Sequence, residues 1–139
     1  MVCELDRATQ ALGLATVLGD CSSVGIAGFT LGGGLGRLMG KHGASCDNLI
    51  SAELVGADGR LFRASADENE DLFWPIRGGG GNFGIVTSLE YQLHAAGQIL
   101  GGVLTYPIEA AREVLSFLHD FMMNVHTNST SSSTSPTQA

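Results

Sequence analysis

The sequence predicts an α+β domain, in which a mostly antiparallel sheet is connected by hairpins and flanked by short helices. Two observations carry this prediction. Asp58-Gly59 is a hairpin turn signal between two apolar segments, and residues 85–93 alternate between apolar and polar side chains. Strands joined by tight turns pair antiparallel, whereas parallel strands need long crossovers. The 139 residues leave room for one domain of about 100–150 residues.

The N-terminal part predicts a short helix over Glu4–Leu12, followed by an extended segment over Leu14–Leu18. Leu5, Ala8 and Leu12 fall on one helical face, and Gly13 is the residue type that ends helices.

The central part predicts a hairpin and then a helix. Asn48–Ala57 and Arg60–Ala64 have strand composition on either side of the Asp58-Gly59 turn. Ser65 with Glu68 matches a capping box, which predicts a helix from about Ala66 to the Trp74-Pro75 pair.

The C-terminal part predicts two strands, a helix and a disordered tail. Ile85–Leu93 and Ile99–Tyr106 are the strands, and the apolar spacing over Glu109–Met123 predicts an amphipathic helix. Residues 127–139 are rich in serine and threonine and bury too little apolar area to order themselves.

Charge and cysteine content narrow the classes of partner. The chain carries 14 acidic and 7 basic residues, a net charge of −7, which disfavours nucleic acid and anionic membrane surfaces. No apolar run approaches the ~20 residues of a membrane span. The three cysteines include no Cys-x-x-Cys pair, so neither a disulfide scaffold nor a metal site is expected.

Glycine is concentrated in two clusters, over residues 25–43 and 78–84, and both lie within apolar sequence. Glycine in folded backbone allows close approach by another group, so the clusters predict a backbone surface that lies against a flat or charged ligand. A dinucleotide-binding turn fits poorly, because Gly34, Gly36 and Gly40 miss the required spacing and Asp58 belongs to a hairpin turn.

Four segments together resemble a known family. They are Gly19–Gly28 with Cys21, Leu31–Gly36 followed by Lys41–Asn48, Ala57-Asp58-Gly59, and Asp71–Val86 with its Arg-Gly-Gly-Gly-Gly-Asn-Phe-Gly run. In this order the chain resembles, over about residues 5–93, the PCMH-type FAD-binding domain of flavin-linked oxidases related to berberine bridge enzyme, in the vanillyl-alcohol oxidase superfamily. The resemblance implies a partial FAD-binding domain (its C-terminal subdomain) over residues 1–96 and the first strand and helix of a truncated substrate domain over 97–126.

The resemblance also implies the cofactor and its contacts. Cys21 falls where some relatives bond covalently to the flavin ring through a 6-S-cysteinyl link; the alternative is that Cys21 packs as a small apolar residue beside a non-covalent flavin. Phe29 stands where many relatives have histidine. No catalytic or metal-binding residue is expected in this chain. The implied FAD contacts are Cys21, Val24, Gly25, Gly28, Phe29, Gly33, Gly36, Ile85 and Val86.

The implied function is the FAD-binding portion of a flavin-dependent oxidase. In such enzymes a hydride passes from a small-molecule substrate to flavin N5, and dioxygen reoxidises the flavin. The alternative is a truncated, catalytically inactive chain that serves at most as a folded scaffold.

Overall fold

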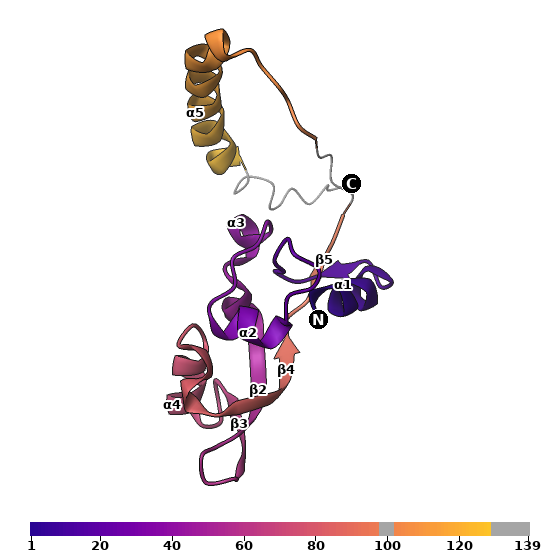
Figure 1. The fold of residues 1–139 in the computed structure, drawn as a ribbon, viewed down its shortest axis with the longest axis vertical. Coiled ribbons are helices and arrows are strands. Elements are labelled where there is room, and N and C mark those ends of the chain that lie inside the picture. Colours follow the sequence, from indigo (N-terminus) through magenta and orange to yellow (C-terminus); the bar gives the residue numbers. More distant parts are fainter. Residues whose placement is uncertain (98–101, 129–139) are drawn as a thin grey trace, which may run out of the picture. The chain divides into compact units, whose positions relative to one another are not determined.

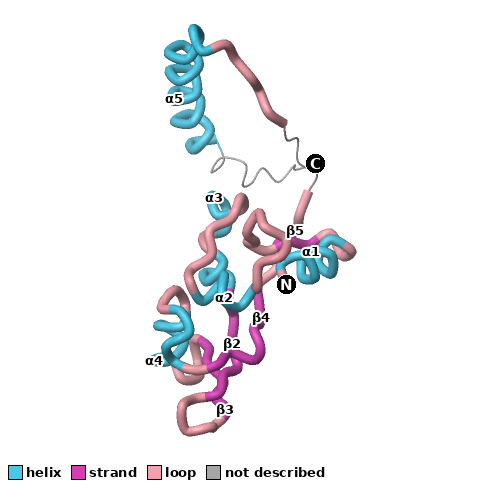
Figure 2. Tube along the Cα trace, in the orientation of Figure 1, coloured by secondary structure: helices cyan, strands magenta, loops and turns pink. Residues whose placement is uncertain are grey.

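The computed structural model describes residues 1–97 and 102–128, which divide into two compact units, Met1–Gln98 and Ile99–Ala139. The first unit contains the predicted mixture of short helices and antiparallel strands (Figures 1 and 2). Its elements are α1 (Val2–Gln10), β1 (Leu14–Ala15), α2 (Ile26–Leu31), α3 (Met39–His42), the 3-10 turn η1 (Ser45–Asn48), β2 (Leu49–Val55), β3 (Leu61–Ser65), α4 (Glu70–Ile76), η2 (Gly80–Phe83), β4 (Ile85–Tyr91) and β5 (His94–Ala95).

The main sheet has the order β3-β2-β4, with both neighbours antiparallel to the central strand β2. Ala52 of β2 lies opposite Ala64 of β3 and Leu89 of β4. The core gathers on one face of this sheet, where α4 contributes Phe73 and Ile76. The complete buried cluster is Leu31, Leu49, Ala52, Leu54, Ala64, Phe73 and Ile76. The predicted α+β class is confirmed.

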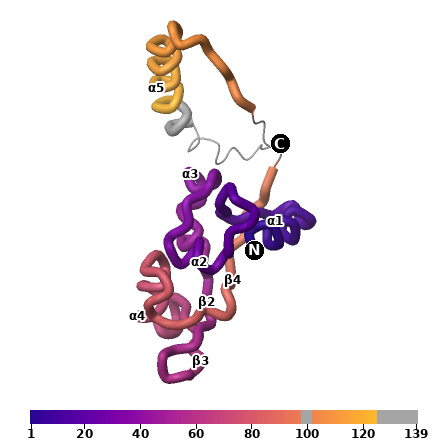
Figure 3. The backbone as a smooth tube through the Cα atoms, in the orientation of Figure 1, coloured from indigo at the N-terminus to yellow at the C-terminus, as the bar shows by residue number. Residues whose placement is uncertain are grey.

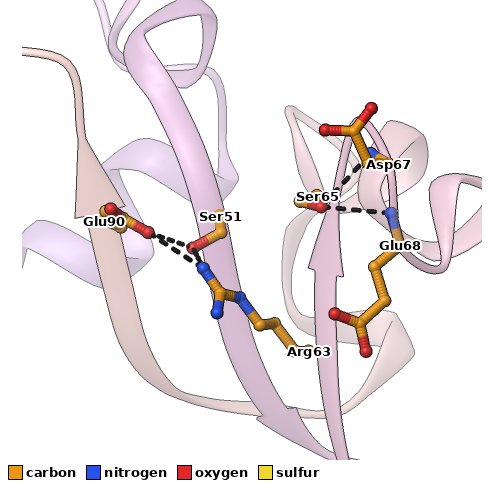
Figure 4. Close-up of polar contacts among 6 residues, drawn as sticks. All are labelled: Ser51, Arg63, Ser65, Asp67, Glu68 and Glu90. Carbon is orange, nitrogen blue, oxygen red and sulfur yellow. Dashed lines mark hydrogen bonds and ion pairs between the residues drawn. The ribbon is translucent and has the colours of Figure 1, made fainter.

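The opposite face of the sheet carries a group of polar side chains (Figure 4). Ser51 of β2 bonds to Glu90 of β4, with 2.6 Å between Ser51 Oγ and Glu90 Oε2. Arg63 of β3 completes the group, because its Nη2 donates to the same Glu90 oxygen at 3.3 Å. The three strands are therefore linked through side chains as well as through backbone hydrogen bonds.

The β2–β3 hairpin is confirmed, but its loop is longer than the predicted two residues. Gly56 N–H donates to Arg60 O at 2.9 Å, which leaves Ala57, Asp58 and Gly59 as the loop. Gly59 has a φ of +76°, so a turn is followed by a left-handed residue, the common three-residue hairpin connection.

The first predicted helix is confirmed over Val2–Gln10, and the start of the extended segment that follows is β1. β1 pairs antiparallel with β5, which joins the start of the unit to its end. In Figure 3 the indigo N-terminal helix runs into the glycine-rich stretch that carries α2. The predicted strand over Ile85–Leu93 is confirmed as β4, which ends at Tyr91.

The predicted start of the second helix at Ala66 is wrong, because α4 begins at Glu70. Ser65 Oγ accepts the backbone N–H groups of Asp67 and Glu68 in a turn that precedes the helix (Figure 4). Asn69 is then left-handed, with a φ of +51°, and the helix can begin only after it. α4 also continues through Pro75 to Ile76.

The second unit contains the 3-10 turn η3 (Ile108–Ala110) and α5 (Ala111–Asn128). The helix predicted over 109–123 is therefore confirmed and extends further. The predicted strand over Ile99–Tyr106 is wrong for residues 102–106, where Val103 and Leu104 are exposed and no strand forms; a strand needs a partner for its backbone groups. Residues 98–101 lie outside the description.

The first two residues of the tail predicted to be disordered, 127 and 128, belong instead to the end of α5. The rest of that tail, residues 129–139, lies outside the described residues. Within the described ranges, no helix combines the length and apolar character needed to cross a bilayer.

Candidate flavin-binding site

The segment over residues 20–36 forms a turn, the short helix α2 and a second loop. Val24 N–H donates to Cys21 O at 3.2 Å, which closes the turn. The turn is fixed to α1, because Val2 N–H donates to Val24 O at 3.0 Å and Cys3 N–H to Ser22 O at 3.1 Å. The half-buried Val24 thus ties this loop to the rest of the unit.

Cys21 presents its thiol to solvent. Its Sγ lies 3.4 Å from Ser23 Oγ. Hydrogen bonds from the Ser23 side chain and backbone lower the pKa of the Cys21 thiol from its ordinary value. Cys46 has the opposite environment, since burial raises the pKa of its thiol. Cys21 is therefore the better placed of the two to react as a thiolate.

The four glycines of the predicted site fall into two kinds. A Cβ added at Gly25, Gly28 or Gly33 would meet no heavy atom within 4 Å, so the backbone there borders open space. Gly36 differs, because a Cβ there would lie 2.2 Å from the carbonyl oxygen of Leu18. Gly36 is thus required for packing, while Gly25, Gly28 and Gly33 leave backbone open to another group.

Phe29 serves as internal packing between two glycines. A Cβ at Gly34 would lie 2.8 Å from its ring, and one at Gly19 would lie 3.0 Å away. The ring therefore holds the loops before and after α2 against the helix.

Ile85 and Val86 begin β4 and have different surroundings. Ile85 is 74% exposed, whereas Val86 packs against the core. Val86 also lines a groove of about 390 Å³ with Ile26 and Ala27 of α2, which joins α2 to β4. Cys21 is not among the residues that line this groove.

Arg37, the residue after Gly36, is already paired. Arg37 Nε donates to Asp20 Oδ1 at 2.7 Å, and Nη2 to Oδ2 at 3.2 Å. Arg77 lies over the ring of Phe73, with its guanidinium carbon 4.7 Å from the ring centroid. A phosphate at this site would therefore rely on backbone N–H groups more than on side-chain charge. Among the described residues no three metal-ligating side chains gather in one place.

The sequence analysis missed a buried group of hydroxyls beside the glycine segment. Thr30 Oγ1 lies 2.9 Å from Ser45 Oγ and 2.6 Å from the Tyr91 hydroxyl. Thr30 and Ser45 are fully buried. The available signal was a threonine and a serine within otherwise apolar, glycine-rich sequence, a place where polar side chains need partners.

Comparison with known proteins matches this chain to FAD-linked proteins. Residues 2–65 match the family described as FAD binding domain. The FAD-linked oxidoreductase pgmH of Aspergillus terreus is 46% identical over 116 residues, which cover 84% of this chain and 24% of that protein. Among solved structures, 6-hydroxy-D-nicotine oxidase from Arthrobacter nicotinovorans superposes with a TM-score of 0.67 at 42% identity, covering 68% of this chain and 21% of the other.

The chain therefore belongs to the FAD-binding domain family of FAD-linked oxidoreductases. Within that class its solved neighbours include a berberine-bridge-enzyme-like protein of Physcomitrella patens, with a TM-score of 0.65 at 39% identity over 67% of this chain and 21% of that one. The resemblance identified from the four sequence segments, and FAD as the cofactor of the family, are confirmed. The chain spans about a quarter of the length of the curated relatives it matches.

Proposed function

We propose that residues 1–96 form part of the FAD site of an FAD-dependent oxidase, and that residues 97–126 begin its substrate domain. The observation that carries the proposal is the open backbone at Gly25 and Gly28, beside the exposed Cys21 thiol, in a segment matched to the FAD binding domain family. A flat ring system can approach backbone only where no side chain stands in between.

The proposed contacts are those that the sequence resemblance assigns. Gly25, Gly28 and Gly33 present backbone, and Val86 supplies apolar contact at the α2–β4 groove. Phe29 and Gly36 act through the packing that shapes the loop. The remaining contacts in the proposal are Cys21, Val24 and Ile85. When bound, FAD accepts a hydride from a small-molecule substrate and passes the electrons to dioxygen.

Cys21 is proposed as the residue that bonds covalently to the flavin ring. Its thiol is exposed and the hydrogen bonds from Ser23 lower its pKa, both of which favour nucleophilic attack. Such a bond would join Cys21 Sγ to a ring carbon, the thiol proton and the replaced ring proton would be released, and dioxygen would take up the two electrons.

A chimera tests the covalent bond. Residues 1–97 replace the matching segment of the Aspergillus terreus relative, and the purified protein is denatured in acid and precipitated. Flavin should stay with the precipitate, be released by Cys21→Ser and be retained in the control Cys46→Ser. Complete release of flavin from the unmodified chimera contradicts the covalent assignment and leaves FAD binding intact.

We further propose that this chain by itself binds FAD weakly and oxidises no substrate, acting alone as a folded scaffold. Its share of the relatives' length and its net charge of −7 support this, because the cofactor's phosphates are also negative. FAD titrated into the purified chain, followed by flavin fluorescence, should give no one-to-one complex with a sub-micromolar Kd. Such a complex would show that these residues suffice as a cofactor site.

A further inference from the structure

The buried hydroxyl group beside the glycine segment connects three parts of the chain. Thr30 belongs to α2, Ser45 begins η1, and Tyr91 ends β4. Thr30 Oγ1 bonds to both of the others, at 2.9 Å to Ser45 Oγ and 2.6 Å to the Tyr91 hydroxyl. Because Thr30 and Ser45 are fully buried, neither can exchange these bonds for water.

Two members of this hydroxyl group, Thr30 and Ser45, are bonded through the backbone to Gly33-Gly34. Gly33 N–H donates to Thr30 O at 2.9 Å, and Ser45 N–H donates to Gly34 O at 2.8 Å. Cys46 N–H adds a third bond, to Gly33 O at 2.9 Å. The position of the two glycines therefore depends on where Thr30 and Ser45 are held.

Gly33 and Gly34 need such support, because their backbone is unusual. Their φ angles are +102° and +77°, in the left-handed region. Because glycine can adopt many other backbone conformations as well, its own preference does not fix this one. Phe29 and Ser45 border Gly34 closely on two sides, but Gly33 has open space where a side chain would be. Contacts at Gly34 and the three backbone bonds must hold the turn.

We propose that Tyr91, acting through Thr30 and Ser45, is the positioning residue that fixes the Gly33-Gly34 turn in its cofactor-ready shape. The proposal rests on the proposed FAD site for its functional meaning, while the positioning itself is a property of the free chain. The phenol suits this task because it remains protonated: burial raises the Tyr91 pKa above its ordinary value, although bonds to Thr30 and Ser45 oppose the rise.

The first test is amide hydrogen exchange on the free chain. Tyr91→Phe and Thr30→Val each remove one hydroxyl and keep the shape of the side chain. Exchange at Gly33, Ser45 and Cys46 should accelerate about tenfold, which corresponds to about 1.4 kcal/mol, while exchange in the central strand β2 stays unchanged. Thr30→Ser restores the hydroxyl and should restore protection, and Tyr106→Phe in the second unit is the matched control.

Two results would overturn the proposal. One is unchanged exchange at the three amides in Tyr91→Phe; the other is equal acceleration there and in β2, which would mean general loss of stability. If Thr30→Val fails to fold, Tyr91→Phe still decides.

The second test measures the Kd for FAD. FAD is titrated to millimolar concentrations, and the shifts of the Gly25 and Gly28 amide resonances report binding. The Kd should rise about tenfold in Tyr91→Phe. It should also rise in Thr30→Val and return toward the unmodified value in Thr30→Ser. An unchanged Kd in Tyr91→Phe would overturn the functional part of the proposal. If the unmodified chain shows no shifts, FAD binding by this chain alone fails, and hydrogen exchange still decides the positioning.

Discussion

His42 and His94 show how a single pair of side chains couples this unit to pH. Their rings are stacked, with centroids 3.7 Å apart and an interplanar angle of 12°. His94 is held in place by Asn48, whose Oδ1 lies 2.6 Å from its Nε2. Burial, followed by the charges of His94 and Lys41, lowers the pKa of His42 below its ordinary value of 6.5. The folded chain therefore favours a neutral His42.

We predict that stability falls as the pH drops below His42's ordinary value. The unfolded chain binds a proton at 6.5 and the folded chain only at lower pH, so protonation favours unfolding in the window between the two pKa values and the loss then levels off. Urea denaturation from pH 7.5 to about 5 should show this slope. His42→Phe keeps a stacked ring without the charge and should flatten it, whereas the control His119→Gln should not. An equal slope in His42→Phe would place the effect elsewhere.

At the scale of elements, Asn69 determines where α4 begins. Its φ of +51° is unfavourable for most residues, and its Nδ2 donates to Arg63 O at 2.7 Å. We predict that Asn69→Ala lowers the free energy of unfolding by about 1–2 kcal/mol, because alanine, unlike asparagine, has no polar side chain to hydrogen-bond locally in the left-handed conformation. Asn69→Gly loses the same hydrogen bond, but glycine adopts a positive φ without steric cost, so the loss of unfolding free energy should be smaller. Denaturant titration of both variants measures this, and equal losses would assign the effect to the hydrogen bond alone.

The elements differ in how far the sequence could predict them. The hairpin and α5 were predictable, because alternation and helical spacing are local properties of the chain. α2 was missed: it has six residues, begins after Gly25 and contains Gly28, so local preference opposes a helix. It forms because Leu31 enters the core and Thr30 finds buried partners distant in sequence. The role of Tyr91 also depends on partners distant in sequence and was therefore missed. The candidate thiol of Cys21 could be identified from its own loop, because it depends only on local sequence.

For the molecule as a whole, charge is the quantity that opposes cofactor binding. The net charge is −7, and Arg37, which follows the last glycine of the proposed site, already pairs with Asp20. We predict that FAD binding to this chain becomes tighter when salt rises from about 0.01 to 0.1 M, because the screening length falls from about 30 to 10 Å and the phosphates are repelled less. Riboflavin, which lacks phosphates, is the control and should show little change. Weaker FAD binding at higher salt would instead reveal a cationic phosphate site.

The close approach of Gly36 to Leu18 has a consequence for how this segment can evolve. Every amino acid other than glycine brings a carbon into the Leu18 carbonyl, so natural selection for folding alone is enough to keep Gly36. A side chain at Gly25 or Gly28 would meet no heavy atom within 4 Å, so on the proposed site it is the bound flavin that would constrain these two positions. In a library of substitutions scored once for protein abundance in cells and once for flavin retention in the chimera, changes at Gly36 should fail both screens. Alanine at Gly28 should pass the abundance screen and fail the flavin screen. A lineage that had lost its cofactor would keep Gly36, while substitutions would accumulate at Gly28.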